Sequence, residues 1–186
     1  VVARIDADSV LNNRSFFINS CGATDVTFSN TSFQQAFVSN FLWRFNIDGN
    51  VVTSNVWSPT ITFPGPGRYQ GELLLTPGTE CGDTGQVFVN IYPSISADFS
   101  FAYDTCVAGP VQFTDLSVSG SGTISRWEWS FGDGERSMAR NPAHTYRNPG
   151  NIPVTLTVTD INGCQATITK VVPYFPVPAL IVIAPS

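Results

Sequence analysis

The second half of this sequence restates the first half at a shift of 83 to 86 positions, and this internal repeat constrains the fold most strongly. The matching residues are Pro59 with Pro142, Pro66 with Pro149, Gly67 with Gly150 and Cys81 with Cys164 at a shift of 83, Cys21 with Cys106 at 85, and Trp43 with Trp129 at 86. Solenoid repeats run over roughly 20–50 residues, so a period of this length indicates two successive small domains. We predict one domain over residues 1–93, a second over 94–175, and a linker or the start of a further repeat over 176–186.

The composition fits two compact domains. Only 12% of the residues are charged, whereas 42% are hydrophobic and 12% are aromatic, so the chain can build cores and disorder is not expected. The formal net charge of −5 and the lack of any run of Lys and Arg argue against a nucleic-acid partner. No apolar stretch approaches the roughly 20 residues of a membrane-spanning helix, so we predict no membrane span in this segment.

The four cysteines occupy equivalent positions in the two copies. The repeat favours pairing within each copy, Cys21 with Cys81 and Cys106 with Cys164. Four free thiols in a cytosolic protein and a zinc site are the alternatives, although zinc ligands usually come in close C-x2-C pairs. A disulfide that closes a loop this long stabilises a domain by about 4 kcal/mol in the chain-entropy model. Disulfides persist in oxidising compartments, so we predict an extracellular or cell-surface location.

Strand patterns run through almost the whole chain. Apolar and polar residues alternate along residues 111–114 and 154–159, as they do in half-buried strands. Turn signals such as Asp48-Gly49 and Asn162-Gly163 separate these segments. Many short strands, regular turns, and a Trp between two cysteines in each copy are typical of immunoglobulin-like domains. We therefore predict an all-β chain of two tandem immunoglobulin-like β-sandwiches.

One strand of each copy carries three aromatic residues on one face, because side chains alternate across a strand. These are Phe41, Trp43 and Phe45 in the first copy and Trp127, Trp129 and Phe131 in the second. A recurring aromatic face is expected of a core, whereas a carbohydrate-stacking platform would not have to recur. Trp57 stands opposite Arg140 in the repeat, so no shared core position requires it. We name Trp57 as the candidate exposed aromatic for ligand binding.

The second copy contains a motif that resembles the PKD (polycystic kidney disease) domain. Its residues are Trp129, Phe131, Gly132, Asp133 and Gly134, followed downstream by His144 and Tyr146. The family hallmark is W-D-F-G-D-G with a later H-x-Y, and Ser130 is a departure because it replaces the usual Asp. The resemblance covers most of residues 95–173 and implies a PKD-type sandwich. The first copy resembles the family mainly through the repeat, since residues 43–49 and 61–63 keep only part of the motif.

The motif residues themselves suggest a structural role. Gly132 and Gly134 flank Asp133 in a tight connection where positive φ is expected, and the Asp133 carboxylate is suited to cap backbone N–H groups. A calcium ion is the alternative, since some PKD domains of secreted proteases are associated with calcium. Calcium takes about six to eight oxygen ligands, and no dense Asp or Asn cluster surrounds Asp133, so we predict no metal and no cofactor. We predict that His144, the only histidine in the chain, is packed rather than catalytic.

The sequence offers no catalytic constellation. A Ser-His-Asp or Cys-His arrangement needs its histidine, and the first copy has none. No glycine-rich phosphate loop or dinucleotide fingerprint is present either. We therefore predict that the chain is not an enzyme.

The motif and the paired cysteines together resemble PKD repeats of large secreted bacterial proteins, including cell-surface adhesins. Joints marked by Pro93 and Pro173 lead us to expect a longer string of similar domains. We predict a non-enzymatic spacer, stalk or adhesive module, whose partners are neighbouring repeats and a protein or polysaccharide at the cell surface. The alternatives are an accessory pair that holds polysaccharide or protein substrate for a secreted hydrolase, and a self-assembling subunit of an extracellular filament. All of these use one scaffold, so the sequence leaves them open.

Overall fold

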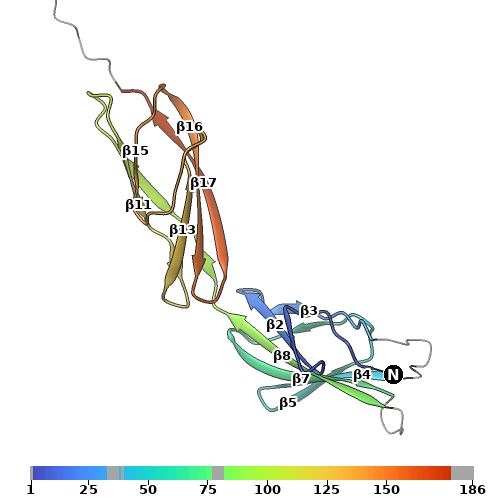
Figure 1. The fold of residues 1–186 in the computed structure, drawn as a ribbon. Coiled ribbons are helices and arrows are strands. Elements are labelled where there is room, and N and C mark those ends of the chain that lie inside the picture. Colours follow the sequence, from blue (N-terminus) through green and yellow to red (C-terminus); the bar gives the residue numbers. More distant parts are fainter. Residues whose placement is uncertain (1, 33–37, 39, 77–81, 177–186) are drawn as a thin grey trace, which may run out of the picture. The chain divides into compact units, whose positions relative to one another are not determined.

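The computed structural model describes residues 2–32, 38, 40–76 and 82–176. The chain forms two compact units, Val1–Pro93 (unit 1) and Ser94–Ser186 (unit 2) (Figure 1). Every element of regular secondary structure in the described residues is a β-strand, so the predicted all-β class is confirmed. The linker or further repeat predicted over 176–186 lies outside the described residues from position 177 onward.

The larger sheet of unit 1 has the strand order β1-β2-β8-β7-β4-β5. Its strands are β1 (Ser9–Leu11), β2 (Ser15–Cys21), β4 (Phe41–Ile47), β5 (Asn50–Ser54), β7 (Gly67–Leu75) and β8 (Asp83–Tyr92). β2 pairs with β8 in parallel, from Ser15 opposite Gln86 to Cys21 opposite Tyr92, whereas the other pairs are antiparallel. A smaller sheet joins β3 (Asp25–Thr27) to β6 (Thr60–Thr62).

These strands form because apolar residues recur at every second position. Along β8, alternate residues from Gly85 to Ile91 are buried and the residues between them are half-buried. The hairpin from β4 to β5 turns at Asp48 and Gly49, whose φ angles are +50° and +82°. Two successive positive φ angles are those of a type I′ turn, which matches the twist of antiparallel strands. The Asp48-Gly49 turn signal therefore lies where the sequence indicates.

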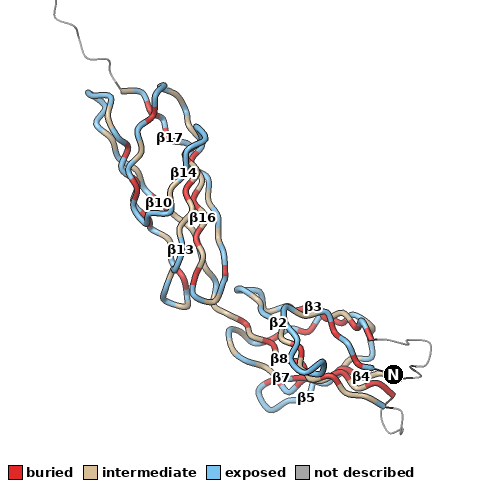
Figure 2. Tube along the Cα trace, in the orientation of Figure 1, coloured by how far each residue is buried: buried red, intermediate tan, exposed pale blue. Residues whose placement is uncertain are grey.

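Unit 2 contains a four-stranded and a three-stranded sheet. The four-stranded sheet has the order β14-β13-β16-β17, with β13 (Ile124–Ser130), β14 (Arg136–Ser137), β16 (Gly150–Asp160) and β17 (Gln165–Tyr174). The three-stranded sheet has the order β10-β11-β15, with β10 (Phe99–Ala102), β11 (Val111–Asp115) and β15 (Ala143–His144). β9 (Ile95–Ser96) pairs with β12 (Val118–Ser119) in a further short sheet. Buried residues alternate with more exposed ones along the strands of both units (Figure 2).

The core of unit 1 is built on an aromatic cluster. The ring of Phe28 lies 5.5 Å from that of Trp43 and 4.7 Å from that of Phe45. Trp43 and Phe45 stack with their planes 9° apart, and both are fully buried. Phe41, expected on the same face, is half-buried and packs at the margin of this core.

The core of unit 2 repeats this cluster. Phe113 takes the place of Phe28, with its ring 5.4 Å from those of both Trp129 and Phe131. The planes of Trp129 and Phe131 are 12° apart. Trp127, expected on the same face, is half-buried at the core margin, as Phe41 is in unit 1. The repeat in the sequence is therefore a repeat of core packing.

Candidate functional site

The motif turn follows β13 directly. Gly132 and Gly134 have φ angles of +83° and +100°, which L side chains rarely adopt. A Cβ atom on Gly132 would lie 2.4 Å from the carbonyl oxygen of Pro153, so the neighbouring strand β16 also excludes a side chain there. Asp133 Oδ1 accepts a hydrogen bond from the Glu135 N–H at 3.1 Å. The Asp133 carboxylate therefore caps the turn.

His144 ties β15 to this turn. Its Nε2 atom lies 2.7 Å from Asp133 Oδ2. Its ring stacks on Phe131, with centroids 4.2 Å apart and planes 1° apart, and meets the Tyr146 ring edge-on at 4.6 Å. The His144 side chain is only 13% exposed. The single histidine is thus held in place by an aromatic ring on each side and by a carboxylate.

The electrostatics of this cluster favour an ionised Asp133. Partial burial acts to raise the pKa of Asp133, but hydrogen bonds from His144 and the Glu135 N–H outweigh it and hold that pKa below its ordinary value. Tyr146 behaves in the opposite way, because burial and, to a smaller extent, the Asp133 charge raise the pKa of its hydroxyl. That hydroxyl is buried and has no hydrogen-bond partner in the part of the chain that the structure describes.

A cavity of about 560 Å³ adjoins the cluster and is lined in part by Asp133, His144 and Tyr146. Both carboxylate oxygens of Asp133 already accept hydrogen bonds inside unit 2, from His144 and from the turn. Across residues 2–32, 38, 40–76 and 82–176, no group of three or more His, Cys, Asp or Glu side chains is placed to hold a metal ion. What the arrangement does is fasten the turn after β13 to β15.

Trp129, the tryptophan of the motif, also makes its contacts inside unit 2. Trp129 is 1% exposed, and its Nε1 atom donates a hydrogen bond to the Ala139 carbonyl at 2.9 Å. The bond holds the segment after β14 against the core. A ring buried to this extent offers no face to a ligand, so Trp129 is not a binding platform.

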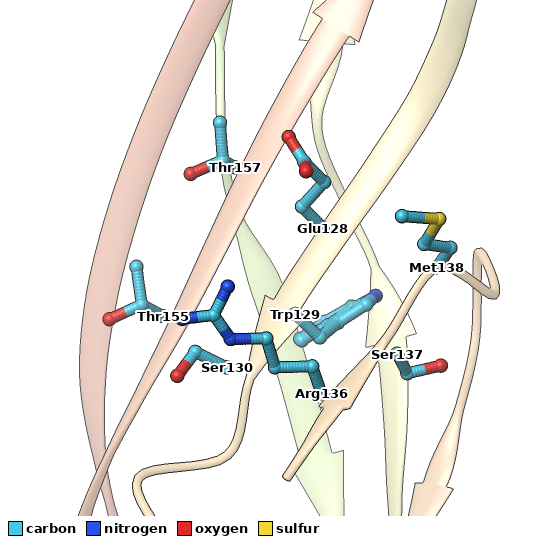
Figure 3. Close-up of a pocket in the computed structure, with 8 residues that line it drawn as sticks. All are labelled: Glu128, Trp129, Ser130, Arg136, Ser137, Met138, Thr155 and Thr157. Carbon is cyan, nitrogen blue, oxygen red and sulfur yellow. The ribbon is translucent and has the colours of Figure 1, made fainter. Parts of the chain in front are cut away.

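A groove of about 490 Å³ lies beside Trp129 on the four-stranded sheet. Hydroxyl groups of Ser130, Thr155 and Thr157 line it together with the charged side chains of Glu128 and Arg136, and Arg136 extends toward Thr155 (Figure 3). No histidine is among its lining residues, so neither Ser130 nor Ser137 has a histidine general base in the groove. Hydroxyl, charged and apolar side chains therefore line the groove together.

Trp57, the candidate ligand aromatic, is half-buried. Its ring meets Phe41 edge-on, with centroids 5.0 Å apart. In unit 2 the matching residues form a matching pair, since the Arg140 guanidinium lies 5.7 Å from the centroid of the Trp127 ring. Trp57 and Arg140 therefore share one role, because each covers the first aromatic residue of the strand in its own unit. The sequence does not reveal this role, since the two residues differ in type. Ligand binding by Trp57 stays a prediction.

Asp115, at the end of β11, anchors a network that the motif does not include. Its side chain is only 1% exposed. Asp115 Oδ2 accepts hydrogen bonds from Trp127 Nε1 at 2.9 Å and Arg140 Nε at 3.3 Å, and Oδ1 accepts one from the Ser117 N–H at 3.0 Å. A buried carboxylate with three donors is a structural hub, because each donor would otherwise lose its partner.

A related network occurs in unit 1, where Asn30 stands 85 residues earlier in the sequence. The Ser32 N–H donates to Asn30 Oδ1 at 3.1 Å, and Ser32 Oγ bonds the backbone N–H and carbonyl of Arg4. In unit 2, Ser117 Oγ likewise bonds the backbone N–H and carbonyl of Asp98. The sequence gives one signal for this network: Asn30 and Ser32 stand 85 positions before Asp115 and Ser117.

The predicted disulfide between Cys106 and Cys164 is wrong. Cys164 is disulfide-bonded, whereas Cys106 is a free and exposed thiol. Cys164 immediately precedes β17, and Tyr174 at the far end of β17 bonds the Gly109 carbonyl, near Cys106 in the chain. Ten residues of strand span about 30 Å, whereas a disulfide needs Cα atoms within about 7 Å. The two cysteines therefore lie at opposite ends of unit 2.

The other predicted pair joins Cys21 to Cys81. Cys21 is disulfide-bonded and lies opposite Tyr92, the last residue of β8. Cys81 lies outside the described residues, two positions before the first residue of β8.

Native, unreduced protein should therefore react with a maleimide at Cys106. An exposed free thiol is available to the reagent, whereas a disulfide sulfur is not. Peptide mapping by mass spectrometry should find the label on Cys106 and none on Cys21 or Cys164. Recovery of a Cys106–Cys164 linked peptide from the same sample would restore the pairing within unit 2.

Comparisons with known proteins can now be set beside this geometry. Residues 96–173 match the family model of the PKD domain. Collagenase ColA of Clostridium perfringens is 47% identical over 49 residues, which make up 26% of this chain and 4% of that enzyme. The chain therefore spans only a small part of the length of this curated relative.

Solved structures give similar matches. The PKD1 domain of Vibrio anguillarum Epp is 30% identical, and the match covers 45% of this chain and 95% of that one with a TM-score of 0.41. The fibronectin(III)-like modules of Clostridium thermocellum CbhA cover 90% of this chain and 91% of theirs at 16% identity, with a TM-score of 0.53. The second likeness extends over both units and concerns the fold alone.

The described residues contain no helix that is long and apolar enough to cross a membrane. The motif geometry and the family match concern the same part of the chain, unit 2. The chain therefore belongs to the PKD domain family, with residues 96–173 as its PKD domain.

Proposed function

We propose that this chain is a non-catalytic accessory segment of a larger secreted or cell-surface bacterial protein, in which its two units act as a spacer. One observation carries the proposal, namely that the motif residues make their contacts inside unit 2. Asp133 pairs with His144, and Trp129 donates to the backbone of its own unit. A reactive site would instead leave such groups within reach of a substrate.

The relatives and the cysteines support an accessory, extracellular position. The matched collagenase is far longer than this chain, which covers 4% of it. Cys21 and Cys164 are disulfide-bonded, and disulfides persist outside the reducing cytosol. The connection between the units also suits a spacer, because β8 ends at Tyr92, β9 begins at Ile95, and Pro93 lies between them. A short joint that contains proline restricts backbone motion.

A second candidate is that the chain holds a protein or polysaccharide substrate for an attached hydrolase. The match to a collagenase favours this role. The half-buried Trp57 and the hydroxyl-lined groove of unit 2 are the surfaces that could carry it.

Small-angle X-ray scattering on the 186-residue chain, at concentrations where it is monomeric, tests the spacer. A single globule of this length should have a radius of gyration of about 16 Å. For a spacer we expect a clearly larger value and a maximum dimension well above that of one globule. A radius of gyration close to that of one globule would contradict the spacer role.

Binding to immobilised collagen, gelatin and bacterial polysaccharides separates the two candidates. The spacer role predicts no retention of the wild-type chain. Retention that is lost in Trp57→Ala but kept in Phe175→Ala, which removes an exposed aromatic from unit 2, would establish the substrate-holding role instead.

A further inference from the structure

We propose that the free edge of β17 is a pairing surface through which two copies of this chain associate, with β17 of one copy antiparallel to β17 of the other. This inference does not depend on the spacer role. β17 is the outermost strand of its sheet and, among the strands that the structure describes, pairs only with β16. A strand in this position presents a row of unpaired N–H and C=O groups.

Contacts at both ends of β17 show which residues face outward. The Tyr103 hydroxyl donates to the Pro173 carbonyl and accepts from the Phe175 N–H at 3.3 Å, so these groups point away from β16. At the other end the Cys164 carbonyl accepts the Asp160 N–H at 2.9 Å and so points toward β16. Backbone direction alternates along a regular strand. The residues whose backbone groups face outward are therefore Gln165, Thr167, Thr169 and Val171.

Unit 1 shows how the equivalent edge is covered when a strand is available. There β8 is paired along its outer side by β2, in register from Ser15 to Cys21. In unit 2 the segment that could do the same is used elsewhere, because β10 pairs with β11. The chain after β10 then turns, with the Cys106 N–H bonded to Asp104 Oδ1 at 2.8 Å. In unit 2 the Tyr103 hydroxyl occupies the outward groups at Pro173 and Phe175, whereas no described strand pairs with the outward side of β17 from Gln165 to Val171.

β17 lacks the devices that usually protect an edge strand. Its register with β16 continues without a bulge from Gln165 to Tyr174, and its single proline, Pro173, lies near one end. Lys170 is its only charged residue. The Lys170 Nζ atom is held 2.6 Å from Asp98 Oδ1 and 2.6 Å from the Phe99 carbonyl, so its charge is paired inside unit 2. Exposed edges of this kind pair with another strand unless charge, proline or a bulge prevents it.

The side chains of β17 suit pairing with a second copy. An antiparallel pair centred on Thr169 places Thr169 opposite its own equivalent and Thr167 opposite Val171. Lys170 then lies opposite Ile168, so no like charges face each other. β-branched residues opposite one another are favourable cross-strand pairs. The pairing has a two-fold axis, so it closes at a dimer and does not extend into a fibre.

Sedimentation equilibrium of the full chain, with Val171→Pro and Val171→Thr as a matched pair, tests the inference. Proline removes an outward N–H and leaves the ladder with β16 intact, as the native Pro173 already does, whereas threonine keeps the N–H. We expect a concentration-dependent dimer whose dissociation constant rises at least about tenfold in Val171→Pro and little in Val171→Thr. A wild-type chain that stays monomeric up to roughly millimolar concentration, or a dimer indifferent to Val171→Pro, would overturn the inference.

Amide hydrogen exchange on the wild type provides a test that does not depend on how the variant folds. The N–H groups of Thr167, Thr169 and Val171 should exchange more slowly as protein concentration rises. Those of Ile168 and Lys170, which already face β16, should be protected at all concentrations. Equal exchange of the outward groups in dilute and concentrated samples would overturn the pairing.

Discussion

Replacing Trp129 with alanine should lower the free energy of unfolding of unit 2 by about 3–5 kcal/mol, the usual loss for a buried Trp. The ring is fully enclosed, 5.1 Å from Phe99 and 5.4 Å from Phe113. Its removal leaves a cavity between the sheets. It also removes the hydrogen bond that Trp129 Nε1 donates to the Ala139 carbonyl. Urea denaturation followed by circular dichroism should show unit 2 unfolding at a lower urea concentration.

Two further variants make this result specific. Trp129→Phe keeps most of the aromatic packing and should cost less, about 1–2 kcal/mol. Trp43→Ala makes the same change in unit 1, so it should destabilise unit 1 and leave the transition of unit 2 in place. A loss below about 1 kcal/mol for Trp129→Ala would show that the aromatic face is not the core.

Replacing Asp115 with alanine should cost unit 2 about 3 kcal/mol, although Asp115 lies outside the family motif. Its carboxylate is buried and accepts from Trp127 Nε1, Arg140 Nε and the Ser117 N–H. The exposed guanidinium of Arg140 can turn to water, but the other two donors lose a partner in a partly buried site. Thermal or urea unfolding of the variant measures this loss.

Asp115→Asn is the matched control, because unit 1 carries Asn30 at the equivalent position. The amide oxygen can still accept from the Ser117 N–H, as Asn30 Oδ1 accepts from the Ser32 N–H. We expect a loss of about 1–2 kcal/mol, smaller than that of alanine. Equal losses in the free energy of unfolding for Asp115→Asn and Asp115→Ala would mean that the side-chain oxygen at position 115 contributes nothing. Asp115 would then not be the structural hub of this network.

The sequence was sufficient for the features that repeat. The shift of 83 to 86 positions implied two domains, and alternation implied strands. The structure shows the same trio of rings in each unit, with Phe28 replaced by Phe113. Such features can be predicted because a core needs the same residue types wherever the fold recurs. The motif around Asp133 could be read as structural because glycines beside an Asp already imply a capped turn.

The sequence was not sufficient for contacts set by where strands begin and end. Cys106 and Cys164 occupy positions shared with the first copy, yet the length of β17 separates them. The repeat shows that a cysteine occupies the same place in each copy. It does not show that the two cysteines of one copy face each other. Asp115 was missed because its partners Trp127 and Arg140 lie on other segments, and nothing in local spacing brings the three together.

The structural role of the motif, on which the proposed function rests, is tested most directly by the pH dependence of unfolding in the wild type and in Asp133→Asn. The folded-state pKa of Asp133 is depressed, so its ionised form stabilises unit 2 above the unfolded pKa. That stability is lost as pH falls through the folded pKa. The side chain is about one-third exposed, so solvent screening limits the effect to about 1 kcal/mol.

Urea denaturation from pH 7 downward should therefore find unit 2 of the wild type more stable than that of Asp133→Asn at neutral pH by about this amount. The difference should begin to shrink near about pH 4, where the carboxylate of the unfolded chain takes up a proton, and should close as pH falls through the lower folded-state pKa. Asp48→Asn, at the exposed turn of unit 1, is the matched control and should leave the unfolding transition of unit 2 in place. Equal stability of wild type and Asp133→Asn at neutral pH would contradict a structural role for the Asp133–His144 pair and point to a contact outside the unit.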